Sequence, residues 1–279
     1  MLSKLRKIIF EGRFRRPAGL VYRGVIYGEL GVQRALDAVF HRQSGRNARI
    51  LQELTAVVKT FERPYTAQRL VDSIRRHYPQ LRVVVVDDSR NPRAIPGVEM
   101  CILPYNSGVS AGRRAGLAEV TTKYVLILDD DYVFYRGTRL VTALSFMEQL
   151  PEIDIMGGCL VNLPFFHTID YSTVSLLSTP ALPVRPIGSR VGAFPVYDKV
   201  ANFFIARTAR LRLVNWDPQL KRVEHADFFT RARGVLTTVY NEDLRCLHAQ
   251  TPFDLNYMKR RLDYQEDIVL LRQRYSAKP

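Results

Sequence analysis

Two apolar runs, residues 83–86 and 124–128, each followed directly by aspartates, constrain the fold of this chain more than any other feature. Residues 81–87 read LRVVVVD, and residues 124–128 read YVLIL before three aspartates. Strands that are apolar at every position must be covered on both faces, which is typical of the centre of a parallel sheet flanked by helices. The sequence therefore predicts an α/β fold with these two segments in the middle of the sheet.

The surrounding segments alternate between strand-like and helix-like patterns, which indicates a mainly parallel sheet built from strand and helix units. We expect strands at 54–60, 81–87, 98–104, 124–128, 153–161, 200–206 and 235–240. We expect helices at 64–79, 108–120, 138–150 and 225–234, the last ended by Gly234. The long segment 162–195, rich in Pro, Ser and aromatic residues, is expected to bind a ligand or to close over a site.

The first fifty residues differ from the rest because basic side chains alternate there with large apolar ones. Such a mixture can lie as an amphipathic segment on anionic lipid. It can equally form a helical appendage that packs on the catalytic domain or on a partner subunit. We expect a basic N-terminal segment at 1–50, with a polar linker at 41–50, and one catalytic domain at 51–279.

The charge and the cysteines limit the class of protein. Lys and Arg exceed Asp and Glu by 41 − 27 = 14, and such an excess attracts polyanions, anionic lipid or phosphorylated substrates. Nucleic acid is not expected, because no base-reading basic helix, zinc-finger spacing or RNP-like string occurs. Three cysteines without a CxxC spacing favour a reducing compartment. With no export signal and no run of ~18 apolar residues, we expect a cytoplasmic protein or one peripheral on the inner membrane face.

The aspartate triplet Asp129, Asp130 and Asp131 is the strongest chemical signal. Adjacent carboxylates repel one another, and hard oxygen ligands select Mg²⁺ or Mn²⁺, which usually take phosphate oxygens as further ligands. Because α/β proteins bind ligands at the carboxyl ends of their strands, this position favours a metal and diphosphate site. The alternative is a surface turn in which the acids cap the next element.

Two further motifs follow other strands. Asp87 and Asp88 end the VVVVDDS segment, where a carboxylate can accept hydrogen bonds from a base or a ribose; a helix cap is the alternative. The segment LPYNSGVSAGRRAGL places Asn106, Gly108 and Arg113 at the start of a helix. Backbone N–H groups and arginine at such a place suit phosphate, although a plain capped helix would explain the pattern equally well.

Together these pieces resemble the GT-A glycosyltransferases. The segments VVKTFERP, VVVVDDS, NSGVSAGRR, LILDDD and VEHADFF match in order and spacing over about residues 54–250. The similarity is greatest to inverting enzymes that include the domain of the ganglioside N-acetylgalactosaminyltransferases and bacterial capsule or lipopolysaccharide transferases. It implies a GT-A fold, Rossmann-like with a mainly parallel sheet, beside the basic N-terminal appendage.

The resemblance also implies roles for individual residues. The nucleotide and its diphosphate would be held by Thr60, Phe61, Glu62, Arg63, Asp88, Asn106, Gly108, Arg113, Asp129 and Asp130. A metal ion would be held by Asp131, Asp129 and His248. An inverting transfer also needs a base for the acceptor hydroxyl, and the segment 222–234 should supply it. Asp227 is the first choice, Glu224 the second and His225 the third, since this chain has Glu224-His225 where many relatives have Glu-Asp.

The resemblance thus implies a metal-dependent enzyme that moves an N-acetylhexosamine or hexose from a UDP-sugar to a glycan or a lipid-linked acceptor, with inversion. The expected cofactor is Mn²⁺ or Mg²⁺, and an anionic membrane surface is a further expected partner. Two alternatives stay open: a nucleotidyltransferase, for which VVKTFERPY lacks a glycine-rich loop, and a non-catalytic glycan-binding relative that has lost its base. The donor sugar, the linkage and the oligomeric state are not read from the sequence.

Overall fold

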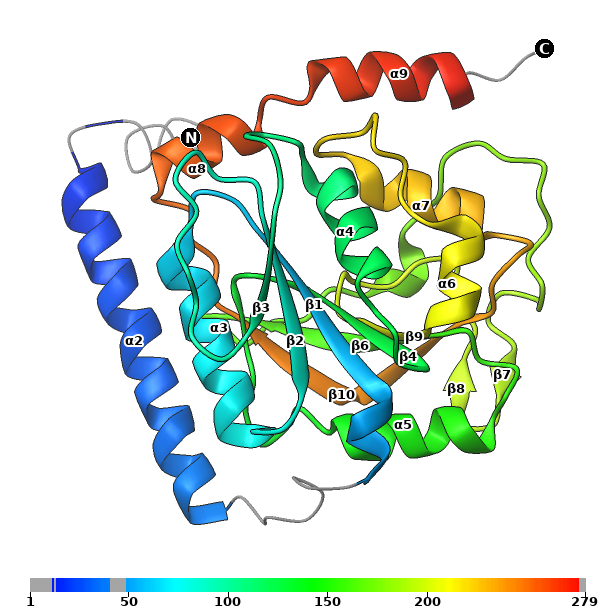
Figure 1. Ribbon diagram of the computed structural model, residues 1–279, viewed down its shortest axis with the longest axis horizontal. Coiled ribbons are helices and arrows are strands. Elements are labelled where there is room, and N and C mark those ends of the chain that lie inside the picture. Colours follow the sequence, from blue (N-terminus) through cyan, green and yellow to red (C-terminus); the bar gives the residue numbers. More distant parts are fainter. Residues whose placement is uncertain (1–11, 13, 41–48, 276–279) are drawn as a thin grey trace.

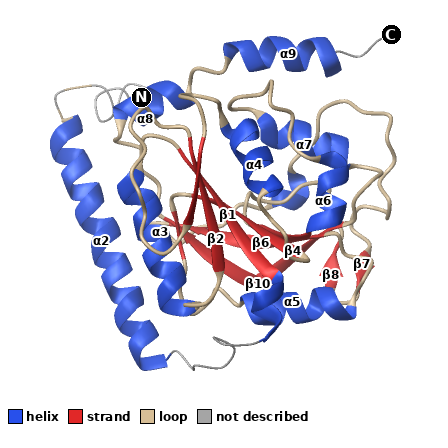
Figure 2. Cartoon of the chain, viewed as in Figure 1, coloured by secondary structure: helices blue, strands red, loops and turns tan. Residues whose placement is uncertain are grey.

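A mainly parallel sheet of eight strands lies at the centre of the computed structural model, which describes residues 12, 14–40 and 49–275 (Figures 1 and 2). The strand order is β3-β2-β1-β4-β9-β6-β10-β5, and β7 and β8 form a separate hairpin. The strands are β1 Leu54–Thr60, β2 Arg82–Asp87, β3 Glu99–Ile102, β4 Tyr124–Asp129, β5 Tyr132–Val133, β6 Ile155–Asn162, β7 Arg190–Val191, β8 Phe194–Pro195, β9 Phe204–Arg207 and β10 Thr238–His248.

The central strands are buried on both faces, as their apolar runs predict. Alternate residues enter different cores: Ala56 and Val58 of β1 pack into one and Val57 into the other. This is the two-residue period of a strand. One face is covered by α3 Pro64–His77 and α5 Leu140–Gln149, and the other by α4 Val109–Ala118, α6 Thr208–Val214 and α7 Glu224–Ala232. The fold is therefore a three-layer α/β structure.

The direction of the strands decides where polar residues gather. β1, β2, β3 and β4 are parallel, and β9 runs antiparallel to both β4 and β6, so that β6 and its parallel neighbour β10 point the same way as β4. The carboxyl ends of these six strands therefore share one edge of the sheet, and five of the six strands end in a polar residue, all but β3, which ends at Ile102. The last residues of those five strands are Thr60, Asp87, Asp129, Asn162 and His248.

The long helix α2 (Arg15–Phe40) lies along one side of the sheet (Figure 1). Its Ile26 and Leu30 pack against apolar side chains of β5, β6 and β10. Near its end, Asp37 accepts a hydrogen bond from the backbone N–H of Arg136 at 3.0 Å and pairs with His77 at 3.1 Å. The expected helical appendage on the catalytic domain is thus present in α2, while most of the expected linker lies outside the described residues.

The C-terminal third differs from the sequence prediction. β10 begins at Thr238 and extends to His248, so His248 ends a strand rather than following one, and α7 ends at Ala232. A bulge between Asn241 and Arg245 breaks the alternating burial of β10. The sequence therefore lacks a continuous two-residue period, and the predicted strand ends too early. Helix α6 and the two last helices, α8 Leu255–Arg261 and α9 Gln265–Tyr275, were not expected.

None of the helices that the structure describes combines the length and the apolar character needed to cross a membrane.

Candidate active site

A cavity of about 380 Å³ opens at the edge where the strands end. This volume lies within the usual range of ligand pockets. All the predicted site residues except Glu62 and Asp227 line it, together with several residues that were not predicted. The predicted residues at the cavity are Thr60, Phe61, Arg63, Asp88, Asn106, Gly108, Arg113, Asp129, Asp130, Asp131, Glu224, His225 and His248.

Asp131 and His248 face one another across the cavity floor. The His248 Nε2 atom lies 3.3 Å from a carboxylate oxygen of Asp131, and the Nδ1 atom lies 2.8 Å from Asn162 Oδ1. The amide oxygen of Asn162 can only accept, so Nδ1 donates to it and Nε2 is left facing Asp131. In metal-binding histidines, the ring nitrogen that does not bind the metal usually donates to an oxygen acceptor, as Nδ1 of His248 does here.

These two side chains fit a hard divalent cation. Two ligands at about 2.1 Å and at right angles are roughly 3 Å apart, which is close to the distance between His248 Nε2 and Asp131. Burial by itself would raise the pKa of Asp131, but the charges of His248 and Arg63 lower it well below the ordinary value. Within residues 14–40 and 49–275, no group of three or more His, Cys, Asp or Glu side chains is arranged to hold a metal ion. The remaining ligands of a bound cation would therefore be substrate oxygens and water.

Asp130 has a different environment from its neighbours. It is buried, accepts a hydrogen bond from Thr60 Oγ1 at 2.7 Å and pairs with the Arg63 guanidinium, which also reaches Asp131 at 3.2 Å. Burial raises the pKa of Asp130, and Arg63 opposes that shift. Asp130 and Arg63 therefore form a buried pair that holds the end of β1 against the aspartate triplet.

Asp88 is bound between β1 and α4. One of its carboxylate oxygens pairs with Lys59 Nζ, and the other accepts a hydrogen bond from the backbone N–H of Gly108 at 2.8 Å. Gly108 has φ +97°, and a Cβ there would lie 2.7 Å from the backbone of Lys221, so only glycine fits. Asp88 thus fixes the first turn of α4 against the cavity.

Arg113 lies between two carboxylates at the centre of the cavity. Its guanidinium pairs with Asp129 at 2.5 Å and with Glu224, and it is fully buried. Burial raises the pKa of Glu224, while the charge of Arg113 opposes the shift. Arg113 therefore connects the strand end that carries the triplet with the first turn of α7.

The three candidate bases on α7 have different surroundings. Glu224 and His225 line the cavity, but Asp227 lies outside it, bound by Arg231 and by the hydroxyl of Tyr275, each at 2.8 Å. The His225 Nε2 atom lies 2.7 Å from the carbonyl oxygen of Val200. Burial, with the charges of Lys199 and Arg113, lowers the pKa of His225 to about 3, so its ring is neutral.

The other predicted residue outside the cavity is Glu62. It is exposed at a turn with φ +58°, and its carboxylate accepts a hydrogen bond from the backbone N–H of Arg90 at 2.9 Å. Trp216 does not line the cavity either, because it is buried in the core and stacks on Phe228 with ring centroids 4.8 Å apart.

Sequence reasoning missed a group of basic side chains at the mouth of the cavity. Lys221 and Arg222 precede α7, and Arg260 and Arg261 belong to α8. Among the described residues, none of these four is paired with a carboxylate; Arg222 donates to Asn106 Oδ1 at 2.8 Å instead. Lys59, which also lines the cavity, could have been predicted, because a lysine inside an apolar strand indicates a functional position. The arginines of α8 could not, because this helix buries no residue and its sequence therefore has no apolar period.

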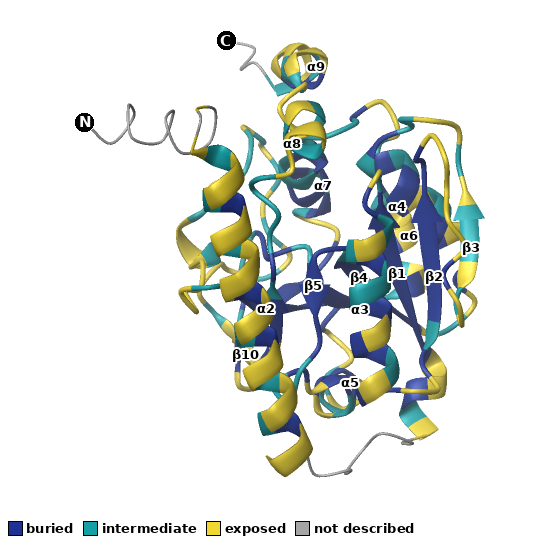
Figure 3. Ribbon diagram, turned by 90° about the vertical axis from the view of Figure 1, so that its left-hand side faces the viewer, coloured by how far each residue is buried: buried dark blue, intermediate teal, exposed yellow. Residues whose placement is uncertain are grey.

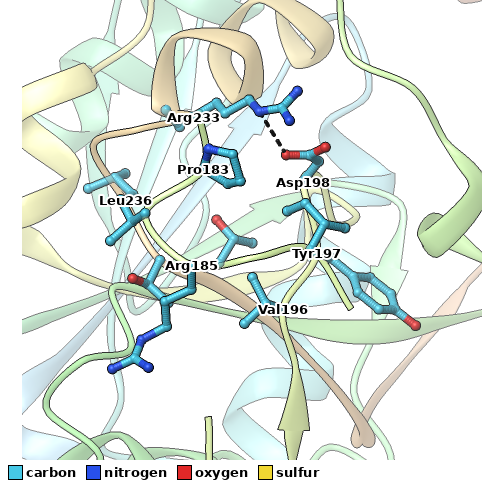
Figure 4. A pocket seen from close by; sticks show the side chains of 12 residues that line it. Pro183, Arg185, Val196, Tyr197, Asp198, Arg233 and Leu236 are labelled. Atoms are coloured by element: carbon cyan, nitrogen blue, oxygen red, sulfur yellow. Dashed lines mark ion pairs between the residues drawn. The ribbon is translucent and has the colours of Figure 1, made fainter. Parts of the chain in front are cut away.

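A second hollow lies beneath the loop that precedes β7 (Figure 4). Asp198 and Arg233 face one another across it at 3.5 Å, and Pro183 and Leu236 contribute apolar walls. Its volume of about 10 Å³ has room for about one water molecule, so it is not a substrate site.

The sequence matches a known family model and characterised proteins. The model described as "Glycosyl transferase family 2" matches residues 55–209. The chain is 37% identical over 209 residues to human beta-1,4 N-acetylgalactosaminyltransferase 1, and 34% identical over 203 residues to mouse beta-1,4 N-acetylgalactosaminyltransferase 2. These matches cover 70% and 69% of this chain. The chain spans about two fifths of the length of these relatives, 39% and 38%.

Solved structures share the fold at low sequence identity. S. aureus TarS 1-349 in complex with UDP-GlcNAc aligns with a TM-score of 0.54 at 18% identity, over 70% of this chain and 57% of that chain. The mannosyltransferase PcManGT from Pyrobaculum calidifontis, in complex with GDP-Man and Mn²⁺, aligns with a TM-score of 0.50 at 14% identity, over 91% of this chain and 76% of that chain. The fold is therefore of the GT-A kind, as the sequence predicts.

Proposed function

The chain belongs to glycosyl transferase family 2, and from this premise we propose that it is a metal-dependent, inverting glycosyltransferase. The observation that carries the proposal is the cavity at the carboxyl edge of the sheet, where Asp131 and His248 meet a group of basic side chains. A nucleotide sugar brings a diphosphate, which needs both a cation and arginine or lysine donors. We propose 51–279 as the catalytic unit and 1–50 as its appendage.

The donor is a UDP-sugar, with N-acetylhexosamine ahead of hexose. The names of the two N-acetylgalactosaminyltransferases and the UDP-GlcNAc in the TarS structure support this choice. The nucleoside would lie beside Phe61 and Asp88, where an aromatic ring and a carboxylate line the cavity. Lys221, Arg222 and Arg260 would then face the diphosphate.

Asp131 and His248 would hold Mn²⁺ or Mg²⁺, which when bound supplies positive charge to the diphosphate oxygens. Arg113 keeps Asp129 and Glu224 in place, because its guanidinium pairs with both. Lys221, Arg222 and Arg260 stabilise the negative charge that the departing diphosphate gains.

Glu224 is the base that we propose. The acceptor hydroxyl attacks the anomeric carbon, the bond from that carbon to the diphosphate oxygen breaks, and the hydroxyl proton passes to the Glu224 carboxylate. Glu224 lines the cavity and has a raised pKa, which makes its carboxylate a better proton acceptor than an ordinary glutamate. Asp227 lies outside the cavity, and the low pKa of His225 makes its ring a poor base.

The acceptor is a glycan or a lipid-linked glycan, and the enzyme works at an anionic membrane surface on the cytoplasmic side. The net charge of +14 and the basic cavity mouth support this proposal. Phosphorylated or lipid-linked acceptors carry the negative charge that such a surface attracts.

The proposal is tested by donor binding and donor turnover. The unfolding temperature should rise with UDP or a UDP-sugar only when Mn²⁺ or Mg²⁺ is present, since a ligand that binds the native state stabilises it. Asp131→Ala should lose that rise, and Glu224→Gln should keep the rise but release UDP about 10² to 10⁴ times more slowly in the presence of acceptor. If no nucleotide sugar shifts the wild-type protein with either cation, the proposal fails.

A further inference from the structure

The outer face of α2 is a large apolar surface on which no other described part of the chain packs. Most of its large apolar side chains are exposed although the helix is anchored on its other side by Ile26 and Leu30. Figure 3 shows this face of α2 as an almost unbroken exposed stripe. The outer face consists of Leu20, Val21, Val25, Tyr27, Val32 and Val39, which are 65%, 67%, 43%, 62%, 54% and 74% exposed.

The outer face is also free of charge. At 100° per residue, every charged side chain of α2 falls within about 80° of the buried Ile26, which leaves an arc of roughly 200° without one. A helix of 26 residues is about 39 Å long. Single exposed apolar residues are ordinary, but a contiguous patch of this length marks an interaction site.

Positive charge runs along one border of the outer face. Arg16, Arg23 and Arg34 are exposed there, and the charge of Arg34 acts on the neighbouring Arg76 of α3. An apolar face bordered by arginines is the arrangement of a helix that lies in the headgroup region of an anionic bilayer. A second copy of this chain would instead bring another charge of +14 against the same border.

The start of α2 lies next to the active site. The rings of Tyr22 and Phe253 contact one another at a tilt of 52°, with centroids 5.4 Å apart, and a Cβ at Gly19 would lie 3.1 Å from Phe253. Burial raises the pKa of Tyr22, and the charge of Asp131 adds to that shift, so the helix is within electrostatic reach of the proposed metal site. Any surface on which α2 rests is therefore close to the cavity.

We propose that the outer face of α2 is the membrane-docking surface of this protein, seated among the headgroups and upper acyl chains of an anionic bilayer. Val21, Val32 and Val39 enter the apolar region, and Arg16, Arg23 and Arg34 contact lipid phosphates. The proposal rests on the proposed function only in that docking would present a membrane-borne acceptor to the cavity. Lipid binding itself requires no nucleotide and no transfer.

The test is vesicle flotation of the full chain without nucleotide, on phosphatidylcholine vesicles with and without ~30% phosphatidylglycerol. The wild-type chain should float with the anionic vesicles. The triple variant Val21→Asp, Val32→Asp, Val39→Asp should lower the bound fraction at least tenfold, because three charges enter the apolar contact. The triple variant Arg16→Gln, Arg23→Gln, Arg34→Gln should lose the preference for anionic over neutral vesicles.

A matched control is the double variant Leu213→Asp, Val269→Asp, which places charge at apolar residues that are 64% and 55% exposed on α6 and α9. It should bind vesicles like the wild type. Each variant should keep its unfolding temperature and its UDP-sugar hydrolysis, so a failed fold or a failed proposed function is recognised separately. Unchanged flotation of the valine variant would overturn the proposal, and so would a wild-type dimer that the valine variant dissociates and that ignores vesicles.

Discussion

Three side chains at the start of α7 show how position, rather than residue type, decides a chemical role. Glu224, His225 and Asp227 are all capable of accepting a proton, yet only the first two reach the cavity. Asp227 is held by Arg231, Arg274 and Tyr275 on the other side of the helix. A residue list from sequence cannot make this distinction, because it depends on the rotation of one helix.

Replacement of each candidate base separates the three. Glu224→Gln should lower kcat by about 10² to 10⁴, which is the usual contribution of a general base, while donor binding stays intact. Asp227→Asn should keep most of the transfer rate, since its side chain lies outside the cavity. The measurement is the rate of UDP release by each variant in the presence of acceptor, compared with that of the wild-type enzyme. Transfer that survives in Glu224→Gln and is lost in Asp227→Asn or His225→Asn would move the role to that residue.

The pH dependence follows from the same carboxylate. Glu224 must be ionised to accept a proton, and burial raises its pKa, with Arg113 opposing the shift. The ionised fraction therefore falls as the pH drops through a pKa above that of an ordinary glutamate, and kcat/KM should fall with it. A pH profile of the wild-type enzyme checks this. A rate that stays flat below the ordinary pKa of a glutamate would contradict the assignment.

At the scale of single elements, close approach between α4 and the sheet has a cost that can be measured. A Cβ at Gly116 would lie 2.4 Å from Val57 Cγ1 and 2.9 Å from Val86 Cγ2, and both side chains are branched and buried. Gly116→Ala should therefore lower the free energy of unfolding by about 1 to 3 kcal/mol. Gly24→Ala on α2, where no atom lies within 4 Å, should instead be neutral or stabilising by about 0.5 to 1 kcal/mol. Urea unfolding of both variants tests the contrast, and equal effects would contradict it.

The anchoring of α2 gives a second prediction for an element. Asp37 is buried where it meets His77 and Arg136. Burial by itself would raise the pKa of Asp37, but the hydrogen bonds from His77 and Arg136 lower it overall. Asp37→Ala should weaken the docking of α2 by about 3 kcal/mol, so that hydrogen exchange of α2 amides accelerates roughly a hundredfold while exchange in β1 is unchanged. Glu29→Ala on the same helix is the control, and equal exchange in both variants would refute the anchor.

At the scale of the whole molecule, the part of the fold that carries the site could be predicted from the sequence, because its strands are fully buried. The runs 83–86 and 124–128 are apolar at every position, which is typical of strands covered on both faces. The direction of those strands then places their terminal acids at one edge. Thus most of the predicted site residues meet in one cavity although they are distant in the chain.

The remainder could not be predicted, for identifiable physical reasons. Helix α8 buries none of its own residues, so no apolar period reveals it, yet its arginines line the cavity. The position of Glu62 depends on a single turn at φ +58° that directs its side chain away from the cavity. The base depends on the orientation of α7, as Asp227 shows. In each case the information lies in tertiary contacts rather than in local pattern.

Asp131 and His248 are the proposed ligands of a cation beneath the donor diphosphate, and the proposed transfer depends on that cation more than on any other group. A crystal of the protein soaked with Mn²⁺ and UDP, measured at a wavelength where manganese scatters anomalously, tests this directly. We predict one anomalous peak within about 2.3 Å of both an Asp131 oxygen and His248 Nε2, with diphosphate oxygens completing the coordination. A nucleotide bound elsewhere, or an ordered diphosphate in the cavity with no peak between these two side chains, would contradict the account.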